Sequence, residues 1–189
     1  MHRRDILALG LSAGLTGVLS TPVLAQTPAL DPQNTLYLDT KDGRITIRLR
    51  PDLAPKHVAQ IKALVKRGFY NGIVFHRVIA GFMAQTGDPT GTGSGGSDLP
   101  DLPAEFTKKA KFVRGTVGMA RTSDPNSANS QFFIMFDAAP SLDGQYTIFG
   151  EVVKGMDVVD KIKKGSQAEG GKVTNPDKIV KMQLAADAK

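Results

Sequence analysis

Short apolar runs, separated by glycine, proline and other turn residues, constrain the fold of this chain more than any other feature. Residues 36–38 and 45–49 alternate apolar with polar side chains, which is the period of a half-buried β-strand. Between them, Asp42 and Gly43 suit the positive φ angles of a tight turn, so an antiparallel hairpin is predicted to open the fold. Further strands are predicted at residues 73–79, 82–86, 115–120, 131–136, 146–153 and 178–185.

Two segments change to the spacing of a helix. Apolar residues recur near this period from Val58 to Val65, and Gly68 supplies a stop, which predicts a helix over residues 55–67. A second helical pattern covers residues 156–164. Eight short strands with two helices indicate either a closed antiparallel β-barrel or a β-sandwich, and the periodicity does not choose between them.

The N-terminus has the pattern of an export signal. Arg3 and Arg4 precede an apolar run at residues 6–19, and small residues at 23–25 suit a signal peptidase, so residues 1–25 are predicted to be a cleaved signal peptide. A membrane anchor is the alternative, but an anchor needs roughly 18 or more apolar residues and this run is shorter. The paired arginines resemble a twin-arginine signal, although they also suit the general secretory route.

This export signal predicts that the mature protein is periplasmic. Once the signal is cleaved, no membrane association is expected. Residues 26–34, which include Pro28 and Pro32, are predicted to be a flexible lead-in, and residues 35–189 form the predicted folded domain. No repeat or long internal linker divides that domain. Nothing in the sequence demands an oligomer, so a monomer is expected.

Composition excludes several classes of chemistry. The chain has 189 residues and the balance of apolar and charged residues typical of one globular domain. It has no cysteine and three histidines, so no disulfide, thiol nucleophile, metal site or cofactor is predicted. Its net charge is +6, or +5 once two arginines and one aspartate leave with the signal. The lysines are scattered without interleaved aromatic residues, so no nucleic-acid partner is expected.

One arginine stands in an apolar strand pattern. With strict alternation, Arg77 shares a face with Phe75 and Ile79, which places a guanidinium among apolar neighbours. Such a group needs either a function or a partner, and a structural ion pair is the alternative reading. His76 points to the opposite face and is predicted to be a packed or hydrogen-bonded core residue.

Five strings of residues together resemble the cyclophilin-type peptidyl-prolyl cis-trans isomerases. They are FHRV at 75–78, GFMAQTGD at 81–88, GTGSGG at 91–96, SQFFI at 130–134 and LDGQYTIFG at 142–150. They occur in the family's order, and the resemblance covers about 150 residues. It implies an eight-stranded antiparallel β-barrel closed by two α-helices, with a shallow peptide groove on its outer surface.

The resemblance also implies roles for individual residues. Arg77 matches the catalytic arginine, and Gln85 is assigned with it to catalysis. The walls of the proline pocket match Phe82, Met83, Phe133 and Leu142. Gln131 matches a polar group along the groove. The family positions that hold the substrate backbone and the residue before the proline match Gly93, Ala120, Arg121 and Thr122. Tyr146 occupies a groove position that is histidine in eukaryotic cyclophilins.

Two departures from the eukaryotic pattern affect inhibition. Ser141 stands where many cyclophilins carry a tryptophan that binds cyclosporin, and Arg121 stands where they often carry asparagine. The resemblance therefore implies only weak cyclosporin binding.

Three classes of function remain for this sequence. The first is an isomerase that rotates Xaa-Pro bonds of exported polypeptides and assists their folding. The second is a chaperone that binds proline-containing segments without turnover, which the retained Arg77 argues against. The third is a hydrolase, but no nucleophile-elbow glycine pattern surrounds Ser130 or Ser141.

Overall fold

The computed structural model describes residues 29–188, so the predicted signal peptide and the first part of the lead-in lie outside the described residues. A single 3-10 turn at Pro32–Asn34 precedes the first strand, and the Asp31 carboxylate accepts a hydrogen bond from the backbone N–H of Gln33 at 2.9 Å. Within the described range, no helix is long and apolar enough to cross a membrane.

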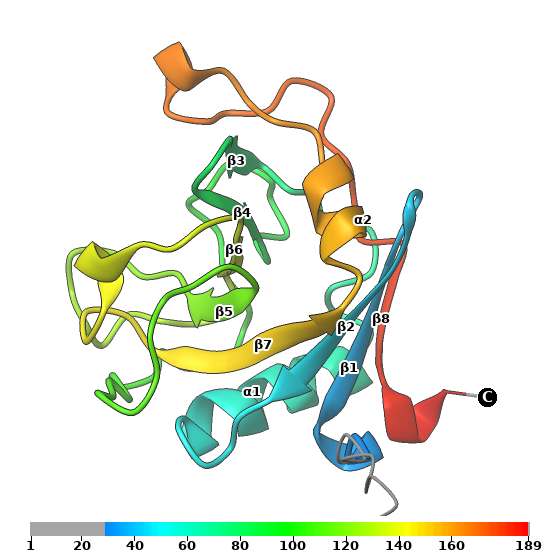
Figure 1. Cartoon of the computed structure of the whole chain (residues 1–189), viewed down its shortest axis with the longest axis vertical. Helices are drawn as coiled ribbons and strands as arrows, with labels where there is room; N and C mark the ends of the chain where they lie inside the picture. Colours follow the sequence, from blue (N-terminus) through cyan, green and yellow to red (C-terminus); the bar gives the residue numbers. More distant parts are fainter. Residues whose placement is uncertain (1–28, 189) are drawn as a thin grey trace, which may run out of the picture.

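Eight antiparallel strands form one sheet (Figure 1). Its order is β3-β4-β6-β5-β7-β2-β1-β8, and the first two strands form the predicted hairpin, in which Gly43 has a φ of +133°. The prediction of eight short antiparallel strands is confirmed. Their bounds are β1 Thr35–Thr40, β2 Gly43–Leu49, β3 Arg77–Ile79, β4 Met83–Thr86, β5 Thr116–Met119, β6 Phe132–Met135, β7 Ile148–Lys154 and β8 Lys181–Leu184.

The sheet is open between β3 and β8, which corrects the prediction of a closed barrel. No ladder joins these two edge strands among residues 29–188. The chain segments that precede them meet instead through an isolated bridge between Val74 and Lys178 and through the backbone N–H of Phe75, which donates to Asp177 at 2.8 Å. The edge of β3 pairs instead with residues 171–173, where the N–H of Val78 donates to Gly171 at 2.8 Å and the N–H of Val173 donates to His76 at 3.1 Å, so β8 does not reach it.

Two helices accompany the sheet, as predicted. Helix α1 spans Pro55–Lys66 and α2 spans Met156–Lys161, and in Figure 1 α1 runs beneath β7 while α2 lies beside β2. Helix α2 is shorter than the predicted range of 156–164. The helix ends before Ile162, whose backbone is no longer helical. The N–H of the next residue, Lys163, donates to the Asp177 carboxylate at 2.9 Å.

A distant carboxylate caps the start of α1. Ala54 occupies the N-cap position and offers no side-chain acceptor. Instead, the Glu105 carboxylate accepts hydrogen bonds from the backbone N–H groups of Lys56 at 3.2 Å and His57 at 3.1 Å, and it lies 2.6 Å from Nδ1 of His57. The negative charge of Glu105 is also attracted to the positive N-terminal end of the helix dipole. Glu105 therefore fixes its own loop against α1.

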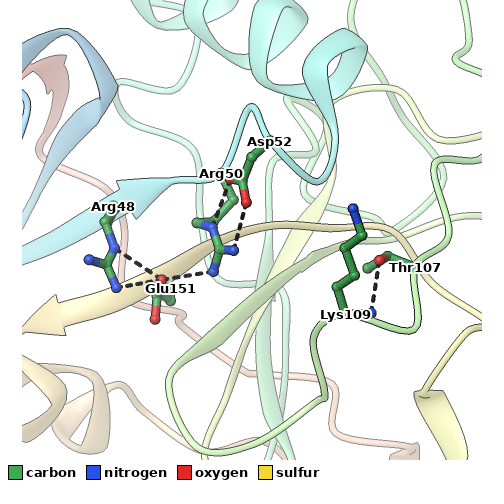
Figure 2. Close-up of polar contacts among 6 residues, drawn as sticks. All are labelled: Arg48, Arg50, Asp52, Thr107, Lys109 and Glu151. Carbon is green, nitrogen blue, oxygen red and sulfur yellow. Dashed lines mark hydrogen bonds and ion pairs between the residues drawn. The ribbon is translucent and has the colours of Figure 1, made fainter.

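An ion-pair network links the sheet to the turn before α1 (Figure 2). Arg48 on β2 is directly opposite Glu151 on β7, and their charged groups lie 2.8 Å apart. The same Glu151 oxygen lies 3.3 Å from Arg50, whose guanidinium also forms a two-point contact with Asp52 at 2.8 Å. Exposed pairs of this kind are worth little individually, so the network mainly supports the register of β2 with β7.

The apolar side chains divide into two clusters because β6 buries both of its faces. Phe132 and Ile134 enter the larger, inner cluster, whereas Phe133 and Met135 enter a smaller, outer one. Met83 of the neighbouring strand β4 joins the outer cluster. Of the residues predicted for the proline pocket, Met83 and Phe133 belong to the outer cluster and Phe82 and Leu142 pack against it, so the alternation of β6 positions the site.

Candidate active site

Two adjoining hollows open on the outer side of β4 and β6. The smaller has a volume of about 190 Å³ and is lined by Arg77, Phe82, Met83, Gln85, Ala120, Arg121, Phe133, Leu142 and Tyr146. The larger, of about 560 Å³, has a wall of glycines and polar side chains that includes Gly93, Thr122 and Gln131. The two hollows share Gln85, Ala120 and Arg121. The structure thus brings every predicted site residue to one continuous surface.

Phe133 and Tyr146 line the smaller hollow, and the buried ring of Phe112 packs against Phe133. Phe133 stacks against Phe112 with ring centroids 5.7 Å apart, and Tyr146 meets Phe133 edge-on at 5.8 Å. A Cβ atom at Gly118 would lie 2.7 Å from Phe112 and 2.8 Å from Phe133, so only glycine fits beneath this pair. Phe112 and Gly118 were not among the predicted site residues, and a glycine inside an otherwise apolar strand was the available signal for the second.

A backbone carbonyl and an amide side chain hold Arg77 in a fixed position. Its Nε donates to the Gly170 carbonyl at 2.9 Å and its Nη1 donates to Oε1 of Gln85 at 3.2 Å. The Gln85 amide donates in turn to Oε1 of Gln131 at 2.9 Å, and Gln131 donates to the carbonyls of Gly93 and Gly95. In each of these two amides the oxygen accepts and the nitrogen donates, so Gln85 and Gln131 form one continuous chain of hydrogen bonds. This chain orients the Arg77 guanidinium beside the smaller hollow.

The ion-pair alternative for Arg77 finds no support in the described part of the chain. None of the nine ion pairs among those residues includes Arg77. Of the five N–H donors of an arginine, two have protein acceptors here. The remaining donors are left for a bound molecule.

The predicted face of Arg77 needs one correction. Ile79 packs against the outer cluster, on the side of Arg77, but Phe75 lies in the inner cluster. Strand β3 begins only at Arg77, so the alternation does not extend back to Phe75. His76 is packed, as predicted, but neither ring nitrogen has a hydrogen-bond partner among residues 29–188. Burial lowers the pKa of His76, although Asp88 acts in the opposite direction.

A buried carboxylate organises the glycine-rich wall of the larger hollow. Asp88 is 1% exposed, and it accepts hydrogen bonds from the N–H and hydroxyl of Thr90, both at 2.7 Å, and from the N–H of Gly93 at 2.6 Å. Burial alone would raise the pKa of Asp88, but these bonds outweigh it and lower the pKa to about 2. The glycine loop is thus a shaped turn around Asp88.

The chain is similar to known peptidyl-prolyl cis-trans isomerases over most of its length. The family model described as "Cyclophilin type peptidyl-prolyl cis-trans isomerase/CLD" matches residues 35–184. A probable peptidyl-prolyl cis-trans isomerase of Brucella suis is 60% identical over 190 residues, which cover 95% of this chain and 96% of the relative. Peptidyl-prolyl cis-trans isomerase-like 3 of Rattus norvegicus is 45% identical over 133 residues, covering 69% of this chain and 82% of that protein.

Solved structures agree with the sequence relatives. A cyclophilin from Hirschia baltica superimposes with a TM-score of 0.74 at 31% identity, covering 85% of this chain and 77% of the other. A Cryptosporidium parvum cyclophilin-type isomerase, crystallised in the presence of the dipeptide Ala-Pro, gives a TM-score of 0.73 at 30% identity, covering 79% and 98%.

An antiparallel sheet with two helices and an outward-facing groove defines a cyclophilin-like fold. The chain belongs to the cyclophilin-type peptidyl-prolyl cis-trans isomerase family. It is an enzyme of that class.

We predict that Asp88→Asn destabilises the fold in a pH-dependent way. The lowered pKa means that ionised Asp88 stabilises the native state above about pH 4, and that this contribution is lost as the pH falls towards 2. The shift corresponds to about 2 kcal/mol, so the variant should lose about that much at pH 7 and about 1 kcal/mol or less near pH 2.5, where Asp88 is only partly ionised. Urea unfolding at both pH values measures it.

Asp98→Asn is the matched control, because Asp98 forms an exposed ion pair with Arg67 at 3.1 Å. Its cost should stay below about 1 kcal/mol. Equal costs for the two substitutions at pH 7 would contradict the role given to Asp88.

Proposed function

We propose that the chain rotates Xaa-Pro bonds of exported polypeptides, with the proline ring in the smaller hollow and Arg77 donating to the imide nitrogen. The observation that carries this proposal is a guanidinium held by neutral groups beside a small hollow whose other walls include Phe82, Met83 and Phe133. The Ala-Pro dipeptide used with the Cryptosporidium parvum relative supports proline-containing substrates.

The reaction itself dictates what such a site must supply. Amide resonance gives the imide bond double-bond character, so rotation faces a barrier of about 18 to 20 kcal/mol, although no bond is broken. At the twisted midpoint resonance is lost, and the imide nitrogen becomes pyramidal with an available lone pair. A donor aimed at that nitrogen stabilises the midpoint more than the planar ground state, which is the differential binding that catalysis needs.

Arginine suits this role for two reasons. It stays protonated at all pH values near neutrality, so it needs no proton transfer. The Gly170 carbonyl and the Gln85 amide orient it without neutralising its charge. The apolar walls around it, formed by Phe82, Met83 and Phe133, would hold the pyrrolidine ring and favour the less polar twisted state.

The strength of a hydrogen bond to a charged group sets how much Arg77 contributes to the rate. A hydrogen bond to a charged group is worth about 1.5 to 3 kcal/mol, and each 1.36 kcal/mol changes a rate about tenfold. Arg77 would then supply a factor of about 10 to 200. The rest of the acceleration would come from holding the peptide in a turned conformation, for which Gln85 and the backbone near Arg121 are placed.

We predict that Arg77→Ala lowers kcat/KM by about 10- to 200-fold while the fold survives. Arg77→Lys should not restore activity, because an ammonium lacks the planar fork that contacts Gly170 and Gln85 together. A protease-coupled assay on a proline peptide measures both variants, with circular dichroism to confirm folding. A lysine variant with near wild-type turnover would refute this role.

A pH profile separates the isomerase from a hydrolase. Ser130 is buried with its hydroxyl donated to the Gly87 carbonyl at 2.7 Å, and Ser141 is exposed, so neither is activated by a described histidine. Isomerisation should be nearly independent of pH from about 6 to 9, whereas a hydrolase would show a titrating base near pH 6 to 7. A rate that rises severalfold through that interval would favour the hydrolase.

The same peptide assay tests the chaperone alternative. A chaperone without turnover would bind the peptide and leave its isomerisation rate at the uncatalysed value.

The compartment and the partners of the enzyme remain part of this proposal. The apolar segment at residues 6–19 behind Arg3 and Arg4 supports export to the periplasm, where newly exported proline-containing polypeptides would be the substrates. The groove contains its full set of candidate residues within one chain, which supports a monomer.

Cyclosporin is predicted to inhibit weakly. Ser141 is exposed near the smaller hollow and offers neither the area nor the indole N–H of the tryptophan found in many cyclophilins. Ser141→Trp should therefore strengthen inhibition at least several-fold. A nanomolar inhibition constant for the wild-type protein would contradict this expectation.

A further inference from the structure

The arginines of the chain differ in whether a carboxylate neutralises them. Residues 29–188 contain seven arginines, and five of them form ion pairs with aspartate or glutamate, namely Arg44, Arg48, Arg50, Arg67 and Arg114. The two without an ion pair in this part of the chain are Arg77 and Arg121. Both line the smaller hollow, so two uncompensated positive charges meet at the groove.

Neutral groups hold the Arg121 guanidinium. Its Nε and Nη2 donate to the Gln145 carbonyl at 3.2 and 2.9 Å, and its Nη1 donates to the Thr122 carbonyl at 2.8 Å and more weakly to Ser123 at 3.4 Å. The guanidinium also lies 4.5 Å from the centroid of the Tyr146 ring. These contacts fix its position, keep its full charge and leave one N–H of Nη2 for an acceptor.

Acidic residues do little to cancel this charge. The smaller hollow has no acidic residue in its lining, and the larger hollow has one, Asp101, which accepts a hydrogen bond from Asn129 at 3.0 Å. Arg121 belongs to both hollows, whereas Asp101 belongs only to the larger one. A peptide that crosses from one hollow to the other therefore passes a positively charged group at their boundary.

We infer that Arg121 makes the groove selective for an acidic residue immediately before the proline. This inference rests on the proposed function, because it places the proline in the smaller hollow. The residue before it then crosses the boundary where Arg121 lies, and a glutamate or aspartate side chain there accepts a charge-assisted hydrogen bond from Nη2. A basic residue at that position is disfavoured by the same charge.

Peptides that differ only at this position test the preference. The probes are succinyl-Ala-Xaa-Pro-Phe-p-nitroanilide with Glu, Gln or Lys as Xaa, since Glu and Gln differ in charge but scarcely in shape. We expect kcat/KM for the Glu peptide to exceed that for the Gln peptide by about three- to tenfold, with the Lys peptide lowest. The preference should shrink between 20 mM and about 500 mM salt, because the site is open to solvent.

Substitution of Arg121 provides the second arm. In Arg121→Gln the Glu-to-Gln ratio should fall to about one, and in Arg121→Glu the Lys peptide should become the better substrate. Ratios within one variant cancel any general loss of activity. Arg44→Gln is the matched control, because Arg44 lies 4.5 Å from the Tyr37 ring in the same stacked contact but lines neither hollow, so its ratio should stay at the wild-type value.

Binding distinguishes failure of this inference from failure of the proposed function. The affinities of the Glu and Gln peptides for the Arg77→Ala variant, followed by NMR chemical shifts, report charge selectivity without turnover. If no peptide is isomerised, the proposed function fails, and tighter binding of the Glu peptide still supports the role of Arg121. The role of Arg121 is overturned if the Glu and Gln peptides have equal affinities and equal rates. It is also overturned if the preference for the Glu peptide survives in Arg121→Gln.

Discussion

Burial of apolar side chains on both faces of β6 is the constraint on which the rest of the structure depends. Phe132 and Ile134 fill the inner core, while Phe133 and Met135 build the outer cluster beneath the smaller hollow. Because side chains alternate along a strand, any shift of register by one residue would exchange these two sets and remove the floor of the groove. The core that stabilises the fold and the floor of the smaller hollow thus both depend on these four residues.

Polar contacts over this floor follow a common design. Arg77 is held by a carbonyl and an amide, and Arg121 by three carbonyls and a ring, so each guanidinium is positioned without a carboxylate. Elsewhere the described arginines are paired, as the network of Arg48, Arg50 and Glu151 illustrates in Figure 2. The described arginines are therefore paired with carboxylates away from the groove and unpaired beside it.

Two of the loops around the site are each tied down by a buried or partly buried carboxylate. Asp88 gathers the backbone of the glycine loop, while Glu105 caps α1 and so anchors the segment that leads to Phe112. Such long connections would be costly to order without polar partners of this kind. A groove built in this way is largely formed before substrate arrives, which reduces the entropy lost on binding.

Local pattern in the sequence determined the hairpin at Asp42 and Gly43, both helices and the set of residues at the groove, the last through motifs that resemble a known family. Tertiary structure alone decided that the sheet stays open between β3 and β8, that Phe75 leaves the face of Arg77, and that Gly118 makes room for Phe112. The reason is physical. Periodicity and turn chemistry act between near neighbours, whereas strand closure, ring packing and the neutralisation of a charge depend on residues tens of positions apart that meet only when the chain has folded.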